Sequence, residues 1–127
     1  MQTEKYPESE LSQRIISAAM EVHSALGPGL LEKFYEDALV HELNLRGMNF
    51  ERQKEIILEY KDKEIGLQRI DLVVEDRIIV ELKAVNDLHP VYEAQILSYL
   101  HAAKLHVGLI LNFNTKRLKE GIKRFVI

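Results

Sequence analysis

The chain contains no cysteine and no long hydrophobic run. Without cysteine, disulfide bonds, thiolate catalysis and cysteine-ligated zinc or iron–sulfur sites are all excluded. No apolar stretch approaches the roughly 20 residues that a helix needs to cross a bilayer. The first ten residues, MQTEKYPESE, also lack the apolar core of a signal peptide. We therefore expect a cytoplasmic protein with no membrane partner.

The chain also lacks net positive charge, since its formal charge at pH 7 is −3. No overall positive field therefore draws nucleic acid to the protein. Residues 116–124 are a local exception, because they hold one acid and five basic side chains: Lys116, Arg117, Lys119, Lys123 and Arg124. This segment is either an ordinary solvated surface or an edge that contacts the phosphate groups of a nucleic acid.

With 127 residues, 46% of them hydrophobic and 29% charged, the chain has the usual composition of one globular domain. We expect a single domain over residues 1–127, with residues 1–9 loosely ordered. Hydrophobic periodicity and chain breakers predict the order α-α-β-β-β-α-β, with a short further strand over 121–126. The predicted helices cover residues 10–26, 30–46 and 91–104, and the predicted strands cover 48–60, 65–74, 78–85 and 106–113. This order indicates an α/β or α+β fold with mixed strand directions.

Capping residues predict the ends of the first two helices. Ser9 is the expected N-cap of the first helix. Gly27, Pro28 and Gly29 should end that helix, because glycine adopts a left-handed cap and proline cannot continue a helix. Gly47 is the expected cap at the end of the second helix.

The stretch RIDLVVEDRIIVELKA, residues 69–84, has the pattern of a β-hairpin with a three-residue loop at 75–77. A loop of this length places Val74 opposite Ile78, and the apolar residues of both strands then share one face. A shift of one residue would pair apolar with charged side chains, so the first register is favoured.

In this register Asp71 lies opposite Glu81, with Cβ atoms about 4.5–5.5 Å apart, where like charges are destabilising. Lys83 projects from the same face and supplies one positive charge. A divalent ion such as Mg²⁺ or Mn²⁺ would supply more, because these ions prefer oxygen ligands. The alternative is a surface salt bridge on the wet face of the hairpin. Val73 and Ile79 share that face and argue against an ordinary solvent-facing surface.

Several other residues have ordinary structural explanations. The glycines before the second helix do not form a phosphate-binding loop, because the GxxxxGK[ST] lysine and a preceding strand are both missing. Glu32 suits the first turn of a helix, where the dipole favours an acid, and Tyr35 fits a core position. Gln95 borders the apolar stripe of the third helix, which contains Tyr99. The histidines show no paired spacing, so a histidine metal site is not expected.

Taken together, these motifs resemble the GxxExxY proteins, a branch of the PD-(D/E)xK nuclease-like superfamily, over residues 10–126. GLLEKFY at 29–35 is similar to the GxxExxY signature. Asp71 followed by Glu-Leu-Lys at 81–83 is similar to the superfamily's acid and E-x-K motif. AQILSYL and GLILNF, later in the chain, also look like this branch. E-x-K triplets alone are common, but the ordered set is specific. Ile70 stands where the superfamily's name has proline, which is often absent.

The resemblance implies a restriction-endonuclease-like core, in which a mixed, roughly four-stranded sheet is flanked by helices. It also implies that Asp71 and Glu81 bind Mg²⁺ or Mn²⁺, with Glu32 reaching in from its helix. Lys83 would orient or deprotonate the attacking water, or stabilise the charge of the transition state. Three further residues would support or line the site: Gln95, Tyr35 and Tyr99.

The implied activity is metal-dependent hydrolysis of phosphodiester bonds, with DNA expected as substrate rather than RNA. One alternative is an accessory or protein-binding module that retains the nuclease-like fold without catalysis. Another is a purely structural hairpin that binds no metal. The sequence shows no appended DNA-recognition module, and a net charge of −3 gives a monomer a weak grip on DNA. A homodimer, which presents two basic edges, would strengthen that grip.

Overall fold

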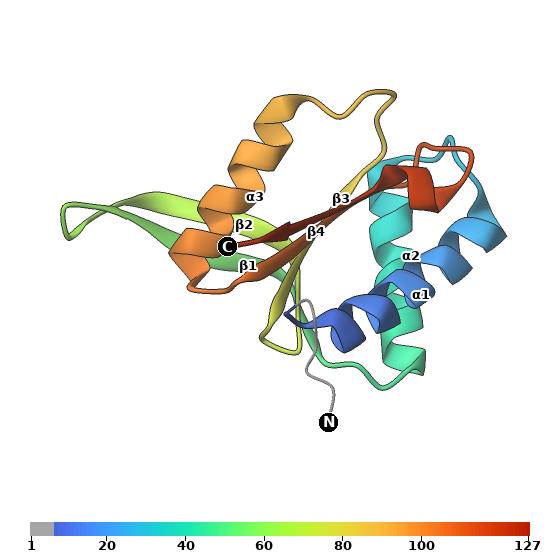
Figure 1. Ribbon diagram of the computed structural model, residues 1–127, viewed down its shortest axis with the longest axis horizontal. Coiled ribbons are helices and arrows are strands. Elements are labelled where there is room, and N and C mark those ends of the chain that lie inside the picture. Colours follow the sequence, from blue (N-terminus) through green and yellow to red (C-terminus); the bar gives the residue numbers. More distant parts are fainter. Residues whose placement is uncertain (1–6) are drawn as a thin grey trace.

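A five-stranded mixed sheet lies at the centre of the computed structural model, which describes residues 7–127 (Figure 1). In space the strands follow their order in the chain: β1 (Phe50–Tyr60), β2 (Lys63–Val74), β3 (Ile78–Lys83), β4 (Val107–Asn112) and β5 (Ile122–Val126). β3 and β4 are parallel, and the other neighbouring strands are antiparallel. The sheet is flanked by α1 (Ser9–Leu26), α2 (Glu32–Leu45), α3 (Pro90–Ala103) and a short 3₁₀ helix, η1 (Leu118–Gly121).

This architecture confirms the predicted fold class and the predicted order of elements. The sheet has five strands because the short final segment pairs with β4. The single domain over residues 1–127 stays a prediction. We expected residues 1–9 to be loosely ordered; of these, residues 1–6 lie outside the described part of the chain. Within that part, no helix is long and apolar enough to cross a membrane.

The predicted N-cap of α1 was wrong by one residue. α1 begins at Ser9, so Glu8 takes the N-cap position, with φ of 56° and no hydrogen bond from its side chain to the helix. The Glu8 carboxylate instead pairs with Arg77 at 3.0 Å, which holds it away from the first turn. The predicted end of α1 is confirmed, since Gly27 is its C-cap with φ of 69°. The predicted cap of α2 was wrong by one residue, because α2 ends at Leu45 and Arg46 is its C-cap; Gly47 follows with φ of 72°.

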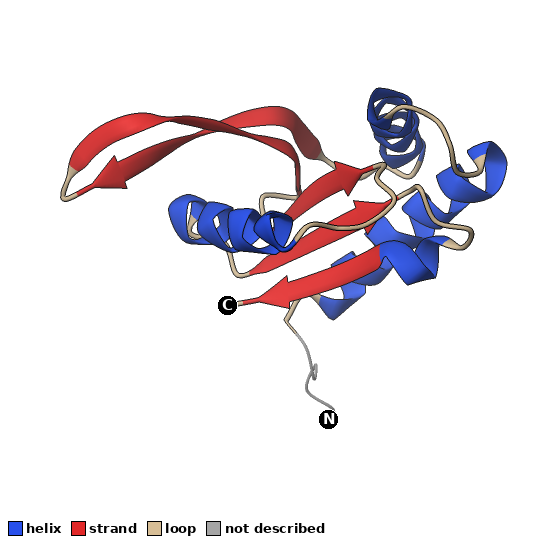
Figure 2. Ribbon diagram, turned by 90° about the horizontal axis from the view of Figure 1, so that it is seen from above, coloured by secondary structure: helices blue, strands red, loops and turns tan. Residues whose placement is uncertain are grey.

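Helices cover both faces of the central strands (Figure 2). One face packs against α1 and α2 through residues that include Leu72 and Val80. The opposite face packs against α3 through residues that include Val73 and Ile79. Because side chains alternate along a strand, Asp71 and Glu81 point to the α3 side, as their neighbours two residues away do.

β1 and β2 extend beyond the rest of the sheet as a long two-stranded arm (Figure 2). β2 pairs with β3 only over Leu72, Val73 and Val74, whereas it pairs with β1 along its length. The two central strands therefore separate at Asp71. There the backbone N–H and C=O groups of β2 and β3 no longer form hydrogen bonds with each other, so side chains must take the place of the missing partners.

The loops after β3 and β4 are tied together at one edge of the sheet, where both parallel strands end. The side chain of Asn112 accepts a hydrogen bond from the N–H of Val85 at 3.1 Å and donates to its carbonyl oxygen at 2.9 Å. The chain then returns through η1, where Gly121 passes close to β4. A Cβ atom added at Gly121 would lie 2.2 Å from the carbonyl oxygen of Asn112.

Gly121→Ala should therefore lower the free energy of unfolding by about 2–4 kcal/mol, because the backbone of η1 or β4 would have to move. Gly66→Ala is the matched control, since a Cβ there meets no atom within 4 Å. The control should change stability by less than about 1 kcal/mol. Chemical denaturation of the two variants and the wild type measures the difference. Equal stabilities of the two variants would contradict the close approach.

Candidate active site

The two acids of the hairpin connect β2 and β3 at the point where these strands separate. The predicted register is confirmed up to this point, with Leu72 opposite Val80. Beyond it the N–H of Asp71 donates to Oε2 of Glu81 at 2.8 Å, and the N–H of Leu82 donates to Oδ2 of Asp71 at 2.9 Å. Each carboxylate is therefore held by a main-chain donor, and the two acids are kept side by side.

This arrangement places the Glu81 side chain in a poorly solvated environment beside the half-buried Asp71. Glu81 is only 7% exposed. Burial, and after it the charge of Asp71, raise the pKa of Glu81 to about 8, and Lys83 offsets only part of this effect. The pair therefore lacks compensating positive charge.

Lys83 lies beside the pair but points its ammonium group at an aromatic ring. Its Nζ atom is 4.2 Å from the centre of the Tyr92 ring in α3. Within residues 7–127 it has no carboxylate oxygen within 4.0 Å. The contact with the ring face stabilises a cation at this position. The sequence analysis assigned no role in the site to Tyr92, because this contact depends on the path of the loop between β3 and α3.

Glu32 is the first residue of α2, and its carboxyl group feels the same charges. Partial burial, and then the charge of Asp71, raise the pKa of Glu32, whereas Lys83 lowers it. The helix thus brings a third acid toward the hairpin. No group of three or more Asp, Glu, His or Cys side chains in residues 7–127 is arranged to hold a metal ion. The direct contact of Glu32 with a metal therefore stays a prediction.

Tyr35 fastens the loop that leads to Glu32. It is fully buried, and its hydroxyl donates to the carbonyl oxygen of Gly27 at 2.5 Å. The same hydroxyl accepts from the N–H of Leu30 at 3.1 Å, and the ring stacks on Phe113 at a centroid distance of 4.7 Å. Of the two roles expected from the resemblance, this geometry fits a buttress of the loop rather than a lining of the site.

The two predicted site residues of α3 differ in position. Tyr99 is 7% exposed, and its pKa is raised by burial and then by the charges of Glu81 and Asp71, so its phenol lies near the pair. Gln95 is exposed, and its side chain forms no hydrogen bond to another described residue. The predicted support of the site by Gln95 stays a prediction.

Polar side chains of β1 and α2 form a network behind Asp71 that the sequence analysis missed. Nε2 of Gln53 donates to Oε1 of Glu36 at 2.9 Å and to Oδ1 of Asp71 at 3.4 Å. Nε of Arg52 donates to Oε2 of Glu36 at 2.6 Å. One signal was present in the sequence, since Glu36 lies four residues after Glu32 and so on the same side of α2. The link to β1 needed the tertiary structure.

The comparison with known families agrees with this geometry. A family model described as the PD-(D/E)XK nuclease superfamily matches residues 9–125. The chain belongs to this superfamily. No curated protein matches the chain significantly. The match of the superfamily's acid and E-x-K motif to Asp71, Glu81 and Lys83 stays a prediction from the sequence. The mixed sheet between helices is consistent with the restriction-endonuclease-like fold of the superfamily.

The five basic residues near the end of this PD-(D/E)XK chain do not form one surface. Lys123 pairs with Glu93 of α3 at 3.0 Å, and Arg124 donates to the carbonyl oxygen of Pro7. The other three, in or beside η1, line one hollow together with the loop between α1 and α2: Lys116, Arg117 and Lys119.

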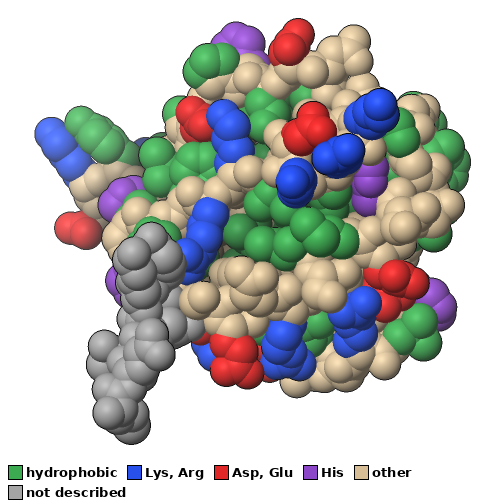
Figure 3. Space-filling view, turned by 45° about the vertical axis from the view of Figure 1, so that its right-hand side comes forward, with side chains coloured by type: hydrophobic (Ala, Val, Ile, Leu, Met, Phe, Trp, Pro, Cys, Tyr) green, Lys and Arg blue, Asp and Glu red, His purple; other side chains and the backbone are tan. Residues whose placement is uncertain are grey.

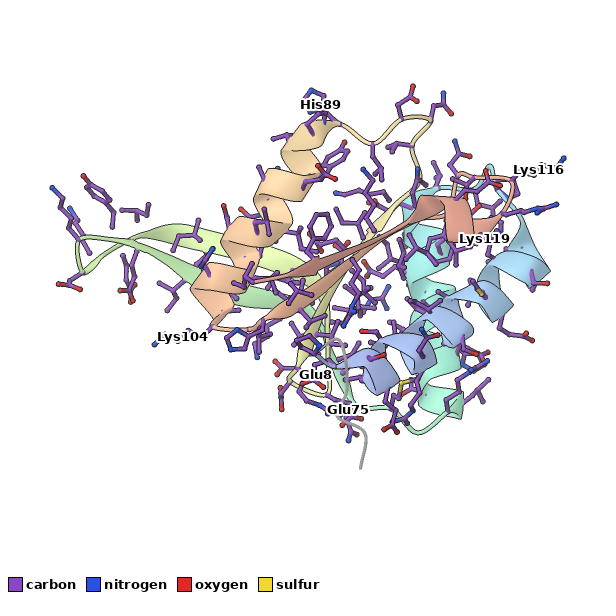
Figure 4. The ribbon with its side chains drawn as sticks, viewed as in Figure 1. Glu8, Glu75, His89, Lys104, Lys116 and Lys119 are labelled. Atoms are coloured by element: carbon purple, nitrogen blue, oxygen red, sulfur yellow. The ribbon has the colours of Figure 1, made fainter. Side chains whose placement is uncertain are left out.

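Lys116 and Lys119 lie at the end of the molecule where α2 begins (Figure 4). A space-filling view of this side shows basic side chains grouped near an apolar surface (Figure 3). We call the segment that holds Lys116, Arg117 and Lys119 the basic loop. It is at the same end of α2 as Glu32.

Glu81→Gln should stabilise the metal-free protein at alkaline pH. Because the pKa of Glu81 is raised from 4.5 to about 8, folded wild type binds an extra proton in this range and loses stability as pH rises through it. Glutamine still accepts the N–H of Asp71 but does not titrate. The variant should be about 1–3 kcal/mol more stable than wild type at pH 8 and nearly equal to it at pH 4.5. Urea unfolding in EDTA at several pH values measures this.

Glu75→Gln provides the control, because that carboxylate also accepts a main-chain N–H, from Asn49 at 2.7 Å, but lies beyond the end of β2. Its stability should follow the same pH curve as the wild type. If Glu81→Gln also followed that curve, the raised pKa would be wrong.

Proposed function

We propose that this protein is a metal-dependent nuclease that hydrolyses phosphodiester bonds of DNA. The observation that carries the proposal is the pair of carboxylates, Asp71 and Glu81, held side by side next to Lys83 where β2 and β3 separate. Membership of the PD-(D/E)XK nuclease superfamily supports it. The resemblance to the GxxExxY branch, through Glu32 and Tyr35, is part of the same proposal.

The residues present fit a hard divalent ion such as Mg²⁺ or Mn²⁺. Two crowded carboxylates with little compensating charge offer the oxygen ligands that these ions prefer. Mg²⁺ commonly uses one or two carboxylates together with waters and substrate phosphates, so Asp71 and Glu81 suffice as its protein ligands. Glu32 would approach as a third. When bound, such an ion lowers the pKa of a water and stabilises negative charge on the scissile phosphate.

Lys83 supplies the positive charge that belongs to the chain itself. Tyr92 holds its ammonium group by the ring face rather than by a carboxylate, so the charge is not neutralised by an ion pair. A cation at this position orients the attacking water or stabilises the charge that develops on the phosphate. Tyr99, near the acids, closes the α3 side of the site and limits its access to bulk water.

The basic loop provides contacts for the backbone of the nucleic acid. Lys116, Arg117 and Lys119 have no ion-pair partner in residues 7–127 and lie at the end of α2 where Glu32 begins the helix. Phosphate contacts of this kind hold a nucleic acid in register without reading its sequence. Lys123 and Arg124, which have partners within the chain, are left out of this surface.

The proposal predicts Mg²⁺- or Mn²⁺-dependent cleavage that is lost in Asp71→Asn and in Glu81→Gln, each by about 100-fold or more. Glu75→Gln should cleave like the wild type. A panel of duplex, single-stranded and branched DNA and of RNA, with and without EDTA, measures this. No cleavage of any substrate by the wild type would sink the nuclease proposal. Unimpaired nucleic-acid binding without cleavage would favour the accessory module.

The proposed phosphate contacts predict weaker binding of DNA by a Lys116→Ala, Lys119→Ala double variant. The log–log slope of affinity against salt should become less steep by about 2, since two phosphate contacts are removed. The control is the Lys61→Ala, Lys63→Ala double variant, which removes equal charge from the tip of the β1–β2 arm. Fluorescence anisotropy in EDTA at several salt concentrations gives both slopes. Equal slopes for the two variants would remove the basic loop from the interface.

A further inference from the structure

Gln53 is the one position at which the pairing of β1 with β2 is interrupted beside the acids. Arg52 pairs with Leu72 and Lys54 with Ile70, so the register continues unchanged on both sides. Gln53, which would face Asp71, is skipped. Its φ is 52°, in the left-handed region, although it lies in the middle of a strand. The pairing of β2 is therefore broken at Asp71 on both sides, toward β1 and toward β3.

A left-handed backbone is disfavoured for a residue that carries a Cβ atom, and it is rare within a strand. Burial of the side chain does not explain it, because Gln53 is exposed. What this conformation achieves is a change in the direction of the side chain, as a bulge does. Strained backbone of this kind is found at sites where the surrounding structure needs a particular geometry.

The redirected amide reaches two acids. Its Nε2 atom donates to Oε1 of Glu36 at 2.9 Å and makes a longer contact, 3.4 Å, with Oδ1 of Asp71. Glu36 is itself fixed through its other oxygen by Arg52 at 2.6 Å, so the amide is anchored from behind.

Asp71 is consequently held through both carboxylate oxygens. Oδ2 accepts the N–H of Leu82 in β3, and Oδ1 faces the amide of Gln53 in β1. These two donors come from the strands on either side of β2. Without the amide, the N–H of Leu82 would be the donor left to hold this carboxylate.

We propose that Gln53 is a positioning residue that orients the Asp71 carboxylate for a divalent ion, and that its left-handed backbone is retained for this purpose. The inference rests on the metal-dependent function proposed above. It assigns to β1 a part in the site that neither acid nor lysine motifs indicate. Hydrogen-bond partners of metal ligands typically change metal affinity by about 10- to 100-fold when they are removed.

The test compares Gln53→Ala with Gln53→Gly, because both remove the amide and only alanine keeps the Cβ atom in the left-handed region. Titration of the metal-free proteins with Mn²⁺, followed by electron paramagnetic resonance of the free ion, gives the dissociation constant. Both variants should bind Mn²⁺ about tenfold more weakly than the wild type. Gln53→Gly should melt about 2–5 °C higher than Gln53→Ala, because glycine adopts positive φ without strain.

Gln68→Ala is the matched control, since Gln68 lies on β2 opposite Ile56. It precedes Asp71 by three residues and therefore lies on the opposite face of the strand. This variant should keep the Mn²⁺ affinity of the wild type. If wild type binds Mn²⁺ and both Gln53 variants bind it equally well, Gln53 has no positioning role and the inference is overturned. If wild type binds no Mn²⁺, the metal site and this inference fall together.

Discussion

The close approach of two acids, Asp71 and Glu81, is the constraint around which this structure is organised. A buried acid beside a second acid needs hydrogen-bond donors that hold both groups. Here the donors are main-chain N–H groups of Asp71 and Leu82. They are available only because β2 leaves β3 at this position, so that the ladder no longer uses them. The separation of the strands and the acid pair therefore depend on each other.

The rest of the fold keeps this arrangement rigid. The core beneath the hairpin, between the sheet and α1 and α2, fixes the strands on one side, and α3 covers the acids on the other. Tyr35 joins the loop before Glu32 to Phe113 at the end of β4. Tyr92 holds Lys83, and Gln53 connects Asp71 to α2. Segments far apart in the chain thus act on a few polar atoms, which is how a folded scaffold pre-organises a site.

The net charge of the chain does not show how its acidic and basic side chains are distributed. The chain is slightly acidic, with a net charge of −3. Glu32 lies near the acid pair of the hairpin. A separate basic loop near the start of α2 holds Lys116, Arg117 and Lys119. A polyanion held by such a loop would still meet a negative centre at Asp71 and Glu81. A divalent ion between the polyanion and these two acids is the simplest way to remove the repulsion between them.

Much of this could be read from the sequence, because the signals were local. The loop length and the alternation of apolar residues determined the hairpin register and placed Asp71 near Glu81. The glycines after α1 and α2 determined where these helices end. The same alternation argues against one basic surface that includes both Lys123 and Arg124. These residues are neighbours in a strand, so their side chains face opposite sides.

Other features were decided only by the tertiary structure. The left-handed Gln53 and the ring of Tyr92 over Lys83 join elements that no local pattern links. The stacking of Tyr35 on Phe113 joins α2 to the segment after β4. Turn chemistry and strand period act over a few residues, so sequence alone could determine which acids face each other. The contacts that orient those acids span helices and strands, and they exist only once the layers have packed.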